Sequence, residues 1–299
     1  MNLGISVEGG HARAVLMDAN GAIAGRSECS GADINDAVVA VVRKMLVGAN
    51  GSRPSAAALS FSDPDSRKWP SDLSFLSGAI GENVPIRTLS TGNASALAEI
   101  WYGSGKGARD LIAFAIGPRV SAGIISNGAL LSGAHGLASS VPWLALNPVE
   151  RDDYRRMGCL EAEGGEAGIV RRLMWRIKSG DHSRVLDSAG GDLNAMTLEM
   201  ILKAARENDG VSISVIRDTV KYLAMALSNI AAVIDPEVIV LGGILQSSSD
   251  LMLEPIRQEC ARRMSPGIYE QVRIEVSQLG ADAAPIGAAR FAQFGSALP

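Results

Sequence analysis

The chain has 299 residues and a mass of 31.2 kDa, which is enough for two domains that each bury a hydrophobic core. Its formal charge of -4 and pI near 5.5 argue against the basic face that nucleic acid requires, so we expect no nucleic-acid partner. No apolar run approaches the roughly 20 residues that span a bilayer. We therefore expect a cytoplasmic protein with no membrane partner.

The N-terminal third alternates strand and helix patterns. A stretch from Leu3 to Gly25 reads as strand, tight turn, strand, polar turn and strand. Apolar spacing and turn residues then predict a helix over 34–47, a strand over 56–61, a polar loop over 62–72, a strand over 84–89 and a helix over 93–102.

The strand–turn–strand pattern recurs from Asp110, which suggests two related lobes that face a shared cleft. Beyond it, the sequence predicts a helical stretch over 159–178 and a long amphipathic helix over 212–234. Pro236 stops the long helix, and an apolar strand then enters a Gly-Gly turn.

Glycines in three turns are candidates for nucleotide binding, because a backbone without Cβ atoms can approach a phosphate closely. Gly-Gly after a buried strand is equally typical of a plain tight turn, so the Gly242-Gly243 turn can be either a nucleotide contact or a purely structural turn. The candidates are Gly9, Gly10, Gly117, Gly242 and Gly243.

Cysteines and histidines do not form a metal or disulfide pattern. Cys29, Cys159 and Cys260 are widely spaced and odd in number, so we expect free, buried thiols. His11 and His135 lack a partner at ligand spacing, which favours solvated or locally hydrogen-bonded rings.

The order of these segments resembles the ROK family of sugar kinases and sugar-responsive repressors. The resemblance rests on LGIS-x-x-GG from Leu3, NASALAE from Asn93, GIISNGALLSGAHGLA from Gly123, GCLEA from Gly158 and DPEVIVLGG from Asp235. It implies an α/β, two-lobed actin-like ATPase (ribonuclease H-like) fold with a cleft between the lobes. Residues 1–108 would form the smaller lobe, completed by a C-terminal helix over 285–299, and residues 109–284 the larger one. It also implies a homodimer.

The family's phosphate-binding and catalytic positions are altered in this chain. The D-x-G-G-T loop of the family corresponds to a segment that begins at Ser6 and contains Glu8, and its G-T-G-x-G loop to one that contains Pro118 and Arg119. Proline has no N–H, so at least one phosphate donor is lost. Arg119 could still approach a phosphate, although an exposed arginine is the commoner outcome.

The family's general base corresponds to Thr91, so no catalytic residue is predicted. A threonine hydroxyl cannot accept a proton near neutral pH. The role is vacant unless Asp63 or Asp65 of the polar loop reaches the site.

The sugar and zinc motifs are altered in the same way. Residues 138–143 replace the family's A-G-E-x-G-H segment, and residues 152–159 replace its zinc-binding motif with a single thiol, so we predict no zinc and no other metal site. Asn93 and Glu161 remain as candidate sugar contacts, although they could also serve as a helix cap and a surface carboxylate. Trp143 either stacks on a ligand or, as we favour, fills space that the zinc loop vacated.

These losses predict a divergent ROK member that is catalytically inactive or strongly impaired. It would be a pseudokinase that needs no cofactor and whose cleft is either empty or binds a small molecule, such as a carbohydrate, without phosphorylating it. The alternative is an ATP-dependent sugar or amino-sugar kinase with a rewired site, in which Mg-ATP lies on the Gly242-Gly243 turn and Glu8, Asp63 or Asp65 does the carboxylate work. A third hypothesis is a scaffold that regulates an active relative.

Overall fold

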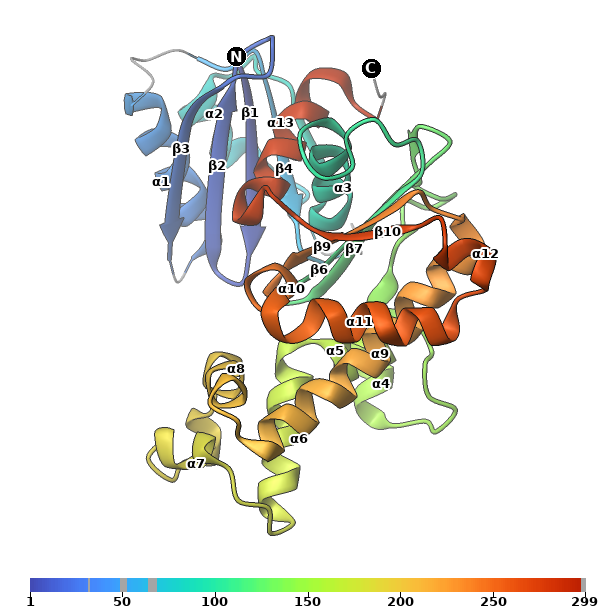
Figure 1. The fold of residues 1–299 in the computed structure, drawn as a ribbon. Helices are drawn as coiled ribbons and strands as arrows, with labels where there is room; N and C mark the ends of the chain where they lie inside the picture. Colours follow the sequence, from blue (N-terminus) through green and yellow to red (C-terminus); the bar gives the residue numbers. More distant parts are fainter. Residues whose placement is uncertain (32, 49–52, 64–68, 297–299) are drawn as a thin grey trace.

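Two five-stranded sheets form the centre of the molecule (Figure 1). The computed structural model describes residues 1–31, 33–48, 53–63 and 69–296. The strand orders are β3-β2-β1-β4-β5 and β10-β9-β6-β7-β8. In both sheets the first strand in sequence is central, pairs antiparallel with the next strand along the chain, and pairs parallel with a later one. The repeated hairpin of the sequence is therefore the start of two sheets with the same topology.

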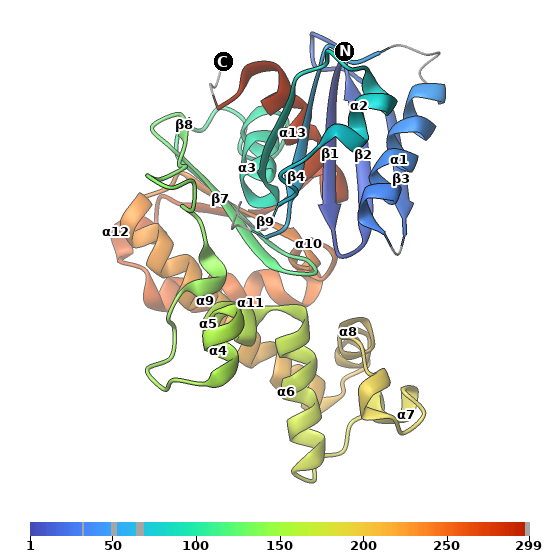
Figure 2. The same cartoon turned by 180° about the vertical axis from the view of Figure 1, so that it is seen from behind.

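The first sheet alternates apolar residues between two covered faces. Leu3 and Ile5 of β1 pack with α1 and α2, and the opposite face receives the C-terminal helix α13 (Figures 1 and 2). Its elements are β1 (Asn2–Glu8), β2 (His11–Met17), β3 (Ile23–Ser30), α1 (Ile34–Gly48), β4 (Ala56–Phe61), α2 (Ser74–Ile80) and β5 (Ile86–Ser90).

Helices α3 (Thr91–Trp101) and α13 (Ala283–Phe294) pack closely against each other and against the first sheet. Small residues allow this approach: a Cβ atom at Gly287 would lie 1.7 Å from the carbonyl oxygen of Ala94, and one at Gly4 would lie 1.9 Å from that of Pro285. The end of the chain therefore belongs spatially with its beginning. The lobe boundary near residue 108 stays a prediction.

The second sheet lies between α3 on one face and α9 with α11 on the other. Its largest apolar cluster joins β6 and β9 to the buried stripe of α9. The elements are β6 (Leu111–Ile116), β7 (Val120–Ser126), β8 (Ala129–Leu130), α9 (Gly210–Ile234), β9 (Val238–Gly243), α10 (Ile244–Ser247), α11 (Ser249–Arg263) and β10 (Arg273–Val276).

The helical stretch expected over 159–178 is confirmed, but it is divided into two helices. Two helices occupy this range, α5 (Cys159–Gly164) and α6 (Glu166–Lys178), because Gly165 between them is extended, with ψ of 163°. A Cβ atom at Gly165 would lie 2.6 Å from the carbonyl oxygen of Glu161, so glycine permits the break. The chain thereby changes direction between α5 and α6 (Figure 2).

The remaining helices are short and lie mostly in the second half of the chain. They are η2 (Val141–Trp143), α4 (Asp152–Met157), α7 (Arg184–Ser188), η3 (Leu193–Ala195), α8 (Leu198–Arg206), α12 (Pro266–Tyr269) and η4 (Gly280–Asp282). Helices α6, α7 and α8 project away from the first sheet (Figure 1). In the described part of the chain, no helix has the length and apolar character that crossing a bilayer would require.

Candidate functional site

A cavity of about 470 Å³ lies between the two sheets. Its walls come from the end of β1, the start of α3, the β6–β7 turn, the β9–α10 turn and the start of α13. This is the cleft that the repeated strand pattern predicts. The residues with polar side chains that line it include Glu8, Arg13, Thr91, Ser95, Glu99 and Arg119.

Three of the five candidate glycines line this cavity, namely Gly117, Gly242 and Gly243. Gly243 has φ of +61°, and a Cβ atom there would lie 2.1 Å from the carbonyl oxygen of Ile116. Packing against β6 thus requires glycine at this turn whether or not a nucleotide binds. The N–H of Gly117 donates to the carbonyl oxygen of Arg119 at 3.1 Å, so this donor is already used within its own turn.

Gly9 and Gly10 form the β1–β2 turn and do not line the cavity. Their φ angles are +54° and +84°, which explains glycine at both positions. A Cβ atom at Gly9 would lie 2.9 Å from Cγ of Pro118. The two turns expected to hold phosphate are therefore in contact with each other at this point.

Glu8 brings a carboxylate into the same cavity, close to the β6–β7 turn. A Cβ atom at Gly117 would lie 3.6 Å from Oε2 of Glu8. Burial raises the pKa of Glu8 above its ordinary value, and the charge of Arg13 offsets part of that rise. An acidic side chain thus lies beside the β6–β7 turn.

Thr91 is the first residue of α3 and lines the cavity. It is buried, and its Oγ1 has no hydrogen-bond partner among the described residues. The interpretation of Asn93 as a helix cap is wrong, because Ser90 caps α3 by accepting the N–H of Asn93 at 3.2 Å. Asn93 lies in the first turn of the helix, outside the lining of the cavity, and its buried Oδ1 also lacks a partner in the described part of the chain.

Glu161 is buried on α5, so its interpretation as a surface carboxylate is wrong. Its Oε2 accepts the backbone N–H of Val120 at 2.8 Å, which joins α5 to the beginning of β7. Burial raises the pKa of Glu161, Arg119 and the Val120 hydrogen bond lower it in part, and Asp63 raises it further. Glu161 does not line the 470 Å³ cavity itself.

Arg119 lines the cavity and is only 30% exposed, contrary to the more common outcome of an exposed arginine. Its Nη1 forms an ion pair with Oδ2 of Asp63 at 3.6 Å, and its buried Nε has no hydrogen-bond partner among the residues described. Asp63 therefore pairs with a side chain of the cleft, although Asp63 does not itself line the cavity. Asp65 lies outside the described residues.

The segment that replaces the zinc motif packs through apolar and polar contacts. Cys159 is buried beside Tyr154 and Ala162, and it is a free thiol like Cys29 and Cys260. No group of three His, Cys, Asp or Glu side chains that could hold a metal occurs among the described residues. The absence of zinc stays a prediction.

The surroundings of Trp143 and His11 bear on two alternatives that the sequence left open. Trp143 is 49% exposed, so the interpretation that it fills an interior space is wrong. The ring Nδ1 of His11 is 2.7 Å from the hydroxyl of Ser30, which confirms a locally hydrogen-bonded ring.

Sequence reasoning missed the pair formed by Glu99 and Ser277, which both line the cavity. Ser277, just after β10, donates its hydroxyl to Glu99, which also accepts the N–H of Ser104 at 3.1 Å. Burial raises the pKa of Glu99. Glu99 ends the NASALAE segment, but nothing in the sequence pairs it with a serine 178 positions away.

Comparisons with known proteins agree with this architecture. The sequence model of the ROK family matches residues 76–294. A glucokinase from Halalkalibacterium halodurans is 29% identical over 209 residues, which cover 68% of this chain and 62% of that protein. The matched region thus spans less than two thirds of that relative.

Solved structures show the same fold. A ROK family glucokinase from Streptomyces griseus, in complex with glucose and AMPPNP, has a TM-score of 0.81 at 22% identity and covers 98% of this chain and 99% of its own. A ROK family transcriptional regulator, a homolog of the E. coli MLC protein, has a TM-score of 0.79 at 21% identity and covers 98% of this chain and 77% of its own. The two-lobed actin-like fold is confirmed.

Proposed function

The chain belongs to the ROK family, and on that premise we propose that its cleft binds a small carbohydrate and transfers phosphate to it weakly or not at all. One observation carries the proposal: three buried polar atoms at or beside the cleft have no hydrogen-bond partner in the described chain. They are Oγ1 of Thr91, Oδ1 of Asn93 and Nε of Arg119. Unpaired buried polar groups cost free energy, and a ligand rich in hydroxyls would supply the missing bonds.

The cleft does not fit the phosphates and magnesium of Mg-ATP well. Pro118 removes a backbone donor and lies against Gly9 across the two turns, and Glu8 places an acidic side chain beside them. Thr91 offers a neutral hydroxyl in the family's base position. We therefore propose that the protein needs no cofactor.

A rewired sugar kinase is the second candidate, and Glu8 favours it. Its half-buried carboxylate lines the same cavity as Thr91, and a raised pKa suits a group that accepts a proton near neutral pH. In this alternative Glu8 takes the proton of the attacking sugar hydroxyl, and Gly242 with Gly243 contacts the nucleotide.

Thermal unfolding with hexoses and N-acetylhexosamines, each with and without millimolar Mg-ATP, tests the proposal. Ligands that bind the native state raise its stability. We expect a shift with at least one sugar, a smaller shift for Thr91→Val, and a parental shift for Thr88→Val, which changes the same side chain on β5 outside the cleft. Absence of a shift with every sugar would contradict sugar binding.

A coupled kinase assay separates the two candidates. Turnover comparable with that of an active sugar kinase would overturn the impaired-kinase proposal. If Glu8 is then the base, Glu8→Gln should lower kcat by about a hundred- to ten-thousand-fold. Sedimentation velocity of the same sample tests the homodimer that we also propose.

A further inference from the structure

A second cavity, of about 540 Å³, lies in the helical part of the larger lobe, away from the cleft. Its walls come from the segment before α4 and from helices α5, α6, α9 and α11. None of its lining residues lines the cleft cavity. The cavity is therefore a separate site and not an extension of the first.

The second cavity is positively charged in a chain that is negatively charged overall. Five of its lining side chains are cationic, and two are carboxylates. When their direct ion-pair partners Asp153 and Glu259 are added, five cations face four carboxylates, which leaves a surplus of one positive charge. The cations are Arg151, Arg171, Arg172, Lys221 and Arg263, and the carboxylates are Asp153, Glu163, Asp218 and Glu259.

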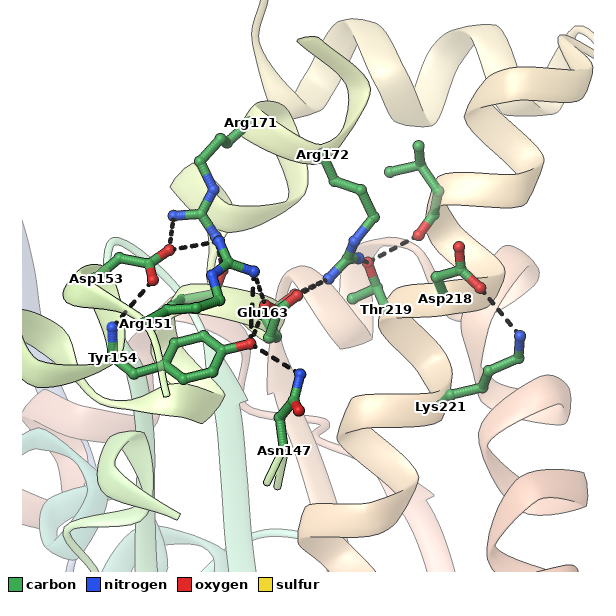
Figure 3. A network of polar contacts seen from close by, with 12 residues as sticks. Asn147, Arg151, Asp153, Tyr154, Glu163, Arg171, Arg172, Asp218, Thr219 and Lys221 are labelled. Carbon is green, nitrogen blue, oxygen red and sulfur yellow. Dashed lines mark hydrogen bonds and ion pairs between the residues drawn. The ribbon is translucent and has the colours of Figure 1, made fainter. Parts of the chain in front are cut away.

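Three arginines are held in place around two carboxylates (Figure 3). Arg151 bonds to Glu163 at 2.9 Å and to Asp153 at 2.7 Å, Arg171 pairs with Asp153 at 2.6 Å, and Arg172 pairs with Glu163 at 2.6 Å. Fixed guanidinium groups lose little conformational entropy when an anion binds, which favours binding.

Donors for a ligand remain after these contacts. Nε of Arg171 is buried and has no hydrogen-bond partner among the described residues. Lys221, which is 46% exposed, forms an ion pair with Asp218, and its ammonium group has further hydrogens that can be donated to a ligand. The cavity thus combines surplus positive charge with unused N–H groups.

We propose that this cavity binds the phosphate group of a small phosphorylated molecule. A phosphate carries a charge of about -1.5 to -2 at neutral pH and offers oxygens that accept several N–H groups at once, so it suits a cavity with surplus positive charge and free donors. The site is independent of any activity in the cleft.

Calorimetric titration of the full chain with inorganic phosphate, glucose 6-phosphate and glucose tests this site. We expect a phosphate-bearing probe to bind saturably and more weakly at higher salt. Glucose should not compete with that probe. Equal affinity for both phosphate probes would assign recognition to the phosphate alone, and tighter binding of glucose 6-phosphate would assign it to a sugar phosphate.

Charge-removing variants locate the binding. Lys221→Gln and Arg263→Gln should each weaken binding about tenfold, the effect of one lost charge-assisted contact. Arg273→Gln, on an exposed ion pair of β10 outside the cavity, and Arg119→Gln, in the cleft, should bind as the parent does. No saturable binding, equal weakening by Arg273→Gln, or loss only in Arg119→Gln would overturn the proposal. Thermal unfolding of each variant confirms that it is folded.

Discussion

Two carboxylates lie two residues apart on α5 and differ sharply in their surroundings. Glu163 accepts hydrogen bonds from Arg151 at 2.9 Å, the hydroxyl of Tyr154 at 2.6 Å and Arg172 at 2.6 Å. Glu161 accepts a hydrogen bond from the backbone N–H of Val120, and burial raises its pKa. A fully paired buried charge holds helices together, whereas an underpaired one beside a cleft weakens the fold and leaves acceptor capacity for a ligand.

The largest effect is expected from Glu163→Ala. The substitution leaves the half-buried guanidinium groups of Arg151 and Arg172 without their shared partner, so the free energy of unfolding should fall by about 3–5 kcal/mol. Urea denaturation measures it. Glu254→Ala, which removes an exposed carboxylate from α11, should stay within about 0.5 kcal/mol of the parent. A loss below about 1 kcal/mol for Glu163→Ala would remove the contrast with Glu161.

Asp153→Asn should have a smaller effect of the same sign. The amide keeps an oxygen acceptor but loses the charge that attracts Arg151 and Arg171, and partial exposure screens that attraction. We expect a loss of about 1–2 kcal/mol by urea denaturation. Asp152→Asn is a matched control. The Asp152 side chain is 86% exposed, so this substitution should change the free energy of unfolding little.

Glu161→Gln should raise the free energy of unfolding, and the size of this gain should depend on pH. Burial places the folded-state pKa of Glu161 above the ordinary value of 4.5, so the parent loses stability as the pH rises through that folded pKa. Glutamine can still accept the Val120 N–H but carries no charge to desolvate. We expect a gain on the order of 1 kcal/mol at pH 8 that vanishes below about pH 4.5. Equal effects at both pH values would contradict this account.

Thr91→Val should have the smallest effect, a gain of a few tenths of a kcal/mol, because it removes a buried hydroxyl without a partner and keeps the shape of the side chain. Thermal unfolding without ligand is the measurement. Thr88→Val, on β5, provides the comparison. A clear loss in Thr91→Val would mean that the hydroxyl is already paired in the native protein.

The two sheets were predictable because strand alternation and glycine turns are local signals. The repeat of the Leu3 and Asp110 segments predicted the shared topology of the sheets. The break at Gly165 was missed because the apolar spacing of residues 159–178 continues through it. The sequence places the start of α3 at residue 93, whereas the helix begins at Thr91, because Ser90 caps it.

The candidate site was predictable only in part. Turn positions at Gly117, Gly242 and Gly243 follow from local sequence, and the structure brings them to one cavity. The contact of Glu161 with Val120 joins residues 41 positions apart. The arginine cavity depends on four helices and a loop meeting in space, which no local pattern of charges reveals.

Helix α5 has consequences for communication within the molecule. It is six residues long, and it carries Glu161 toward the cleft and Glu163 toward the arginine cavity. Because both carboxylates belong to this one helix, a displacement of α5 at the arginines would also displace the carboxylate that accepts the N–H at the start of β7. The two cavities share no lining residue, yet α5 contacts the surroundings of both.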